Sequence, residues 1–328
     1  MGIMIGSVPL ADPVFLAPMA GVTDRPFRHL AKRFGAGMVV SEMIASQAMV
    51  RAAGRTLRMA EVYADEQPLT VQLAGCEPAV MAEAARRNVD RGAAVIDLNF
   101  GCPVKKIVNG QAGAALMRDE ARAGAIMAAV ARAVPVPVTV KMRLGWDDSR
   151  RNAPALARIA EESGIALLTV HGRTRSQFYR GHADWRAIRD VKEAVRLPVI
   201  ANGDITRLDD VAICLEQSGA DGVMIGRGAC GRPWFPGQVA HFLRTGETLP
   251  SPSLAEQHAL VQEHYQAMLD FYGREAGLRI ARKHLCWYSR GLDGSSAFRE
   301  AVNHTDAPEA VLALIDALYG PALERMAA

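Results

Sequence analysis

Eight short apolar runs, each followed by a stretch of helical periodicity, constrain the fold of this 328-residue chain more than any other feature. The runs are rich in β-branched residues and lack a polar alternation, which is typical of strands buried on both faces of a parallel sheet. The intervals between them leave room for the helical crossover that parallel strands require. Eight such units predict an α/β fold, a closed (β/α)8 TIM barrel, rather than an open doubly wound sheet. The runs are residues 13–19, 38–43, 69–74, 94–99, 137–142, 167–170, 198–202 and 222–226.

The β pattern ends before residue 245, and the rest of the chain shows helical patterns only. A TIM barrel takes about 250 residues, so this chain is longer than the barrel needs. Residues 250–253 read Pro-Ser-Pro-Ser, and Ser253 is a suitable N-cap for a following helix. We therefore expect a barrel domain at 1–245 and a small all-helical C-terminal domain at 246–328. Its expected helices cover residues 254–272, 277–290 and 308–319.

Composition argues against several classes of protein and site. No run of about 18 uncharged apolar residues is present, so no membrane span is expected. The N-terminal residues before Asp12 contain no Lys or Arg, unlike a secretory signal, and we expect a cytoplasmic protein. The five cysteines include no CxxC pair, so neither a disulfide framework nor a metal site is expected. The net charge of +3 is too small to identify a partner.

Two strand ends carry residues suited to chemistry, and the active site of this fold lies at the C-terminal ends of the strands. Cys102 lies where the fourth run becomes a loop, in the sequence NFGCP, which is a poor place to bury a sulfur atom. Lys141 projects from the fifth run into the barrel mouth and can place a cation beside the reduced, anionic ring of a flavin. The plainer alternatives are a buried thiol in a turn and a solvated charge at the rim.

The last two strand ends, Asn202-Gly203-Asp204 and Gly226-Arg227-Gly228, occupy the place where barrels hold a phosphate. Glycines permit close approach of the backbone, and N–H groups at a helix start favour an anion. Together with the thiol, the lysine and the amides of Gln72 and Asn99, they suggest a phosphorylated planar cofactor. FMN is the natural candidate.

Eight segments at these strand ends, taken in order, resemble the tRNA-dihydrouridine synthase family. The resemblance extends from about residue 8 to about residue 320, and Lys105-Lys106 with the tail sequence RIARKH at 279–284 is similar to the bacterial B-type branch. Phe100 stands where the family often has Met, and both side chains are apolar. The segments are APMAGVTD (17–24), EM (42–43), QLAG (72–75), DLNFGCP (97–103), KMR (141–143), HGRTR (171–175), NGDI (202–205) and MIGRG (224–228).

The resemblance implies an oxidoreductase that reduces the C5=C6 bond of a specific uridine in the D-loop of tRNA, with FMN as cofactor and NADPH or NADH as reductant. Cys102 would be the proton donor, because a thiol with a pKa of about 8.5 keeps its proton near neutral pH. Asn99 would hold an edge of the uracil, and Arg143 or Arg173 would meet a substrate phosphate or an enolate-like oxygen. The residues implied to bind the flavin are Pro18, Met19, Ala20, Gln72, Lys141, His171, Asn202, Gly203, Asp204, Gly226 and Arg227.

The tail helix carries Arg279, Arg282 and Lys283 near one face, and Arg290 falls near the same face further along. We expect the first three to contact tRNA phosphates. The plainer alternative is a solvated basic face. Two other functions remain as alternatives: a flavin barrel that acts on a free pyrimidine, as dihydroorotate dehydrogenases do, and a non-enzymatic RNA-binding regulator. The first would not need the helical tail, and the second would not need Cys102 or Lys141.

Overall fold

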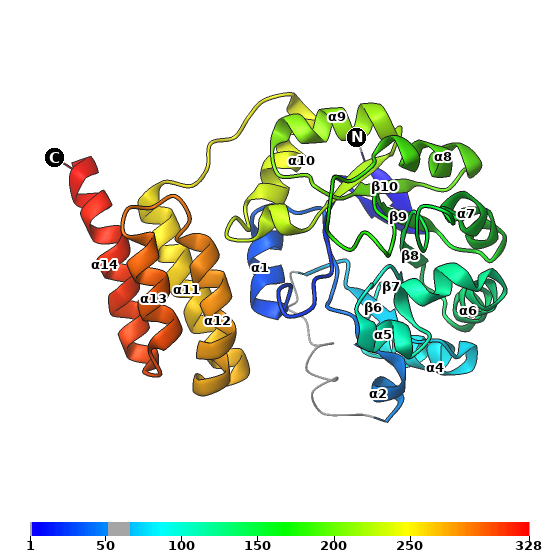
Figure 1. The fold of residues 1–328 in the computed structure, drawn as a ribbon, viewed down its shortest axis with the longest axis horizontal. Coiled ribbons are helices and arrows are strands. Elements are labelled where there is room, and N and C mark those ends of the chain that lie inside the picture. Colours follow the sequence, from blue (N-terminus) through cyan, green and yellow to red (C-terminus); the bar gives the residue numbers. More distant parts are fainter. Residues whose placement is uncertain (1, 52–65, 328) are drawn as a thin grey trace.

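The parallel sheet forms from all eight predicted runs. The computed structural model describes residues 2–51 and 66–327, and the strands follow the order β4-β3-β11-β10-β9-β8-β7-β6-β5. Figure 1 labels the middle of this order, from β6 to β10. The second run is divided, because β4 pairs with β3 whereas Val40 bridges Thr70 of β6. The second run therefore pairs with β3 near the start of this order and with β6 near its end, which closes the sheet into the predicted barrel. The strands are β3 (Val14–Leu16), β4 (Met38–Val39), β5 (Ile44–Ala45), β6 (Thr70–Ala74), β7 (Val95–Phe100), β8 (Val138–Arg143), β9 (Leu167–His171), β10 (Val199–Asn202) and β11 (Gly222–Ile225).

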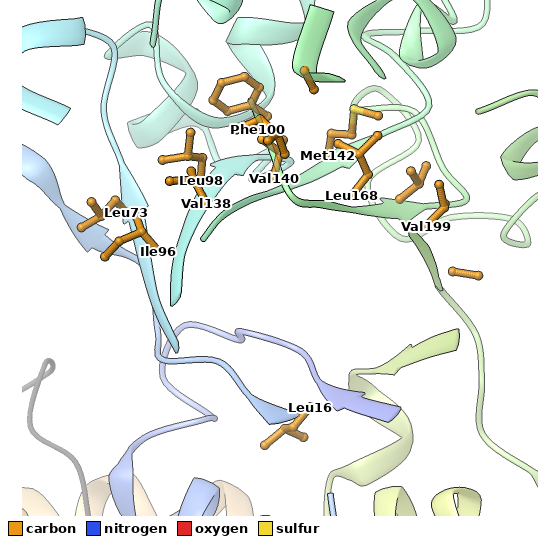
Figure 2. Close-up of a cluster of buried hydrophobic side chains, with 14 of the residues drawn as sticks. Leu16, Leu73, Ile96, Leu98, Phe100, Val138, Val140, Met142, Leu168 and Val199 are labelled. Carbon is orange, nitrogen blue, oxygen red and sulfur yellow. The ribbon is translucent and has the colours of Figure 1, made fainter. Parts of the chain in front are cut away.

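Helices surround the sheet and bury its outer face. Figure 2 shows part of this core, in which apolar side chains of neighbouring strands lie together beneath the helices. The stretches of helical periodicity after the third, fourth, sixth and seventh runs form helices, as predicted. The helices of this layer are α1 (Arg25–Arg33), α2 (Ser46–Val50), α4 (Pro78–Val89), α6 (Glu120–Ala133), α7 (Ala153–Glu162), α8 (Arg186–Ala194), α9 (Leu208–Ser218) and α10 (Phe235–Thr245).

Alternation along each strand decides which side chains enter the barrel. On β7, Ile96, Leu98 and Phe100 belong to the outer core, so the intervening Asp97 and Asn99 point inward. The expectation of strands without polar alternation therefore missed a polar interior near the C-terminal strand ends. The same alternation on β8, β9 and β10 brings in Thr139, Lys141, Arg143, His171 and Asn202.

An N-terminal hairpin, which the sequence analysis did not predict, closes the opposite end of the barrel. Strands β1 (Ile3–Ile5) and β2 (Val8–Leu10) pair antiparallel around a two-residue turn. Their apolar residues Ile5 and Leu10 pack with interior residues from the starts of several strands, including Phe15 and Val95. The pocket for chemistry is thereby restricted to the other end.

Four helices form a bundle beside the barrel: α11 (Leu254–Tyr272), α12 (Arg274–Tyr288), α13 (Ser295–His304) and α14 (Pro308–Ala327) (Figure 1). The predicted Ser253 cap is confirmed, because its hydroxyl accepts from the Glu256 amide while the Glu256 carboxylate accepts in return. Helix α13 was not predicted. The boundary expected after residue 245 falls where α10 ends, and the bundle core also includes Leu30 and Trp234 of the barrel. In the part of the chain that the structure describes, no helix is long and apolar enough to cross a membrane.

Candidate active site

One cavity of about 820 Å³ opens at the C-terminal ends of the strands. Two residues of its wall come from the bundle: Trp287 lies on α12, and Arg290 lies two residues after the end of that helix. The barrel mouth and the bundle therefore enclose a common site. The predicted residues that line the cavity are Pro18, Met19, Ala20, Gln72, Asn99, Cys102, Lys141, Arg143, His171, Asn202, Gly203, Asp204, Gly226 and Arg227.

Hydrogen bonds of its backbone groups hold Cys102 in place just after the end of β7. Its amide donates to Oδ1 of Asn99 over 2.9 Å, and the Gly101 amide donates to the same oxygen over 3.2 Å. Its carbonyl accepts from the amide of Ala114, in the 3-10 helix Gly113–Arg118, over 3.0 Å. Burial raises the pKa of the thiol, although Arg143 and Lys141 oppose the shift. The thiol therefore keeps its proton at neutral pH.

Lys141 reaches across the barrel interior. Its ammonium donates to Oδ1 of Asn202 over 2.9 Å, and the amide of Asn202 donates to the carbonyl of Met224 over 2.7 Å. Burial and the neighbouring Arg143 lower the pKa of Lys141 to about 8, although Asp97 opposes the shift. Lys141 is thus a cation at neutral pH that titrates within the accessible range.

His171 is neutral at the cavity wall. Burial, with Lys141 and other cations nearby, lowers its pKa well below the usual value. A guanidinium nitrogen of Arg173 lies 3.3 Å from Nε2 of His171. Because a guanidinium only donates, Nε2 is the acceptor and the proton is on Nδ1. His171 can therefore offer one N–H to a ligand without adding charge.

Arg173 does not line the cavity. Its side chain is buried and forms two hydrogen bonds to the carboxylate of Asp204, of 2.9 and 2.5 Å, and two to the carbonyls of Arg180 and Gly181. Although burial alone would raise the pKa of Asp204, the hydrogen bonds from Arg173 hold it below its usual value. A substrate contact through Arg173 would require this side chain to leave Asp204. Arg173 therefore holds Asp204 in place just after the end of β10.

The ends of β10 and β11 supply free backbone donors. Within residues 2–51 and 66–327, the N–H groups of Gly203, Asp204, Arg227 and Gly228 have no hydrogen-bond acceptor. Gly203 has φ +120, and a Cβ there would lie 2.9 Å from the His171 ring, so only glycine keeps the strand end open. The exposed Arg227 adds a guanidinium beside these amides. This donor set fits a phosphate.

Arg143 lines the cavity but uses much of its guanidinium to hold neighbouring loops. It donates to the carbonyl of Gly101 over 2.8 Å, and to those of Thr174 and Phe178 over 2.9 Å each. Burial lowers its pKa to about 10, so it is charged at neutral pH. It faces the ring of Tyr179 at 5.6 Å, and Arg227 faces the same ring at 5.0 Å. Arg143 therefore links the Cys102 loop to the mouth of the cavity.

The three basic residues expected on one face of the tail helix lie in different surroundings on α12. Arg279 is exposed. Arg282 donates to the carbonyl of Thr305 over 2.8 Å and to Asp306 over 3.2 Å, which directs it toward α13. Burial lowers the pKa of Lys283, which faces the carboxylates of Asp24 and Glu42. Arg282 and Lys283 therefore have partners within the protein while Arg279 is exposed, and the contact of the three residues with tRNA stays a prediction.

Trp287 was missed by sequence reasoning, and Arg290 was expected on a basic helix face but not at the cavity wall. Trp287 and Arg290 arrive because α12 packs tightly on the barrel at Gly231, where a Cβ would lie 2.6 Å from the Trp287 backbone. A contact between distant segments leaves no local signal. The sequence did indicate Asp97, which lies beneath the cavity. It is two residues before Asn99 on β7 and therefore points to the same, inward side of the strand.

A family model described as dihydrouridine synthase matches residues 15–322 of the chain. The chain belongs to this family. A probable tRNA-dihydrouridine synthase of Rickettsia bellii is 57% identical over 324 residues, which cover 98% of this chain and 99% of that protein. The tRNA-dihydrouridine synthase B of Xanthomonas axonopodis pv. citri is 52% identical over 310 residues, covering 94% and 93% of the two chains. The resemblance seen in the sequence, including the B-type branch, is confirmed.

Solved structures of lower identity share the barrel. Histamine dehydrogenase from Rhizobium sp. 4-9 has a TM-score of 0.55 at 15% identity, over 75% of this chain and 47% of that chain. Morphinone reductase has a TM-score of 0.54 at 14% identity, over 78% and 91% of the two chains. At this identity the likeness concerns the fold alone, and it agrees with the predicted TIM barrel.

Proposed function

We propose that this chain is an FMN-dependent tRNA-dihydrouridine synthase that reduces a D-loop uridine, with NADPH or NADH as reductant, in the cytoplasm. Membership of the dihydrouridine synthase family supports the reaction class. The observation that carries the proposal is a single cavity with a protonated thiol on one wall and an anion-binding strand end on another.

FMN fits the residues present. The free amides of Gly203, Asp204, Arg227 and Gly228 would hold its phosphate, and the N–H of His171 would meet the ribityl–phosphate side. Lys141 would hold the negative charge of the reduced ring, and the segment Pro18–Ala20 would pack against its face. When bound, the flavin supplies a hydride for C6 of the uracil.

Cys102 would complete the reduction by giving its proton to C5. Hydride addition at C6 moves negative charge toward C5 and O4, because the double bond is conjugated to a carbonyl. An acid on the opposite face of the base must then supply a proton. The buried thiol meets this requirement, since its raised pKa keeps the proton in place until carbanion character develops. Asn99 lies beside the thiol and would hold an edge of the uracil.

The bundle at 246–328 would serve as the tRNA-binding domain. A uridine inside folded RNA must leave its stack to reach this cavity, at a cost of a few kcal/mol. Contacts to phosphates supply much of the affinity in such complexes. Arg290 at the cavity wall and the exposed Arg279 on α12 would contact these phosphates.

Purified protein, supplied with FMN, NADPH and tRNA transcripts, provides the test. We expect a gain of two hydrogens in one tRNA uridine, detected by nucleoside mass spectrometry. Turnover of a free pyrimidine such as orotate, with none on tRNA, would favour the dihydroorotate dehydrogenase-like alternative. A colourless protein that binds tRNA without changing it would favour the non-enzymatic regulator.

A further inference from the structure

We propose that Asp97 is a positioning residue that sets the direction of a hydrogen-bond chain ending at the backbone of Cys102. The chain passes through Gln72 and Asn99, both of which line the cavity. This inference rests on the proposed role of Cys102 and extends it to a residue beneath the cavity floor.

The chain is continuous and short at every link. The Asp97 carboxylate is buried, with 3% of the residue exposed, and accepts from Nε2 of Gln72 over 2.7 Å. Oε1 of Gln72 accepts from Nδ2 of Asn99, also over 2.7 Å. Oδ1 of Asn99 then accepts from the amide of Cys102 over 2.9 Å. The other Asp97 oxygen accepts from the hydroxyl of Thr139 over 2.6 Å.

The two ends leave only one orientation for the two side-chain amides. An ionised carboxylate can only accept, so Gln72 must direct its NH₂ group toward Asp97. A backbone amide can only donate, so Asn99 must direct its oxygen toward Cys102. Reversing either amide would place two donors or two acceptors against each other, and an unsatisfied buried group costs about 1–3 kcal/mol.

The barrel itself brings these groups together. Gln72 and Asp97 are register partners on β6 and β7, and Asp97 and Thr139 are register partners on β7 and β8. The links among Thr139, Asp97, Gln72 and Asn99 therefore lie across adjacent strands of a closed sheet, and only the last link, to the Cys102 amide, reaches a loop. Asp97 would thus fix both the loop that carries the thiol and the amide groups that the flavin and the uracil meet.

The test is a variant and its compensating swap. In D97N the new amide can donate to Gln72, which would turn Gln72 around and remove the acceptor for Asn99. In Q72E/D97N the amide at 97 donates to the carboxylate at 72, whose second oxygen accepts from Asn99. The swap restores the original orientation of Asn99 and keeps one carboxylate and one amide at positions 72 and 97. T139V removes a hydrogen bond to Asp97 without reversing the chain, so it is the matched control.

Each protein is loaded with FMN, reduced, and mixed with tRNA in a single turnover. We expect D97N to slow tRNA-dependent flavin reoxidation by about 10²-fold, the scale of a misplaced reacting group. Q72E changes a residue of the proposed flavin site, so the swap is judged by the alkylation of Cys102 and not by its rate. T139V should stay near the native rate. Alkylation of Cys102 by iodoacetamide, followed on its peptide by mass spectrometry, should change in D97N and return in the swap.

Native rates in a folded D97N protein would overturn the inference, as would alkylation of Cys102 in Q72E/D97N that stays at its D97N value. If D97N does not fold, the swap decides, because only a restored orientation of Asn99 predicts a folded protein with native alkylation of Cys102. C102A separates the two proposals. An impaired C102A with an unimpaired D97N rejects only the positioning role, whereas an unimpaired C102A rejects Cys102 as the acid.

Discussion

The hydroxyl of Tyr272 on α11 donates to Oδ2 of Asp24 over 3.0 Å, and so joins the bundle to the residue that caps α1. The other oxygen of Asp24 accepts from the amide of Phe27 over 3.0 Å. Burial raises the pKa of Asp24 to about 6, although the bonds from Phe27 and Tyr272 oppose the shift. Asp24 also ends the segment that lines the cavity with Pro18 and Met19, so this bond couples the bundle to the site.

Y272F should therefore destabilise the protein in a pH-dependent way. Above pH 6 Asp24 is ionised, and loss of a bond to a charged group should lower the free energy of unfolding by about 2 kcal/mol. Because Tyr272 lowers the pKa of Asp24, the penalty should shrink toward about 1 kcal/mol as the pH falls through 6. Urea unfolding at several pH values measures it. Y265F is the control, since Tyr265 donates to the neutral carbonyl of Pro308, and its penalty should not vary with pH.

C102A should separate chemistry from binding. The thiol supplies a proton, so its loss should lower the rate of dihydrouridine formation by about 10²–10⁴-fold. Flavin content, measured by absorbance after gel filtration, should match the native protein, because the phosphate donors on β10 and β11 are untouched. Dihydrouridine formation at the native rate would move the acid elsewhere, and Tyr179, in contact with His171 at the cavity wall, would be the next candidate.

Flavin affinity should depend on the charge of Lys141. With a pKa of about 8 in the protein without ligand, Lys141 loses its positive charge as the pH rises through 8. The dissociation constant of FMN should be flat below this pH and rise above it, by up to about tenfold per pH unit. Fluorescence titration between pH 6 and 9 measures the profile. K141M should bind FMN weakly at every pH, whereas K192M, on α8 outside the cavity, should keep the native profile.

The sequence predicted the barrel well because each strand carries its own apolar run and each helix its own periodicity. Ser253 and the helix it caps were predicted correctly for the same reason: the capping box is a local motif. The β1–β2 hairpin was missed because its strands are three residues each and too short for a clear pattern.

The site was predictable only where function follows from position along a strand. Cys102 lies just after β7 and Lys141 lies near the end of β8, and both line the cavity. Arg173 lies just after β9, yet it is buried against Asp204, because pairing between side chains of different strand ends is not encoded locally. The hydrogen bond from Arg282 to Thr305 was not predicted, since helical spacing alone does not show that α13 packs beside Arg282.

Arg279 offers the clearest test of the tRNA-binding role proposed for the bundle. It is exposed on α12, and R279A should weaken tRNA binding and flatten the plot of log affinity against log salt by up to about 0.9 for a duplex phosphate. R282A should change the slope less, because Arg282 is already bonded to Thr305 and Asp306. R325A, on α14, is the control and should keep the native slope, since Arg325 pairs with Asp293. Flavin content and reduction by NADPH should stay native in all three. An unchanged slope in R279A would mean that Arg279 is only a solvated basic residue. Arg290 at the cavity wall would then be the candidate for the RNA contact.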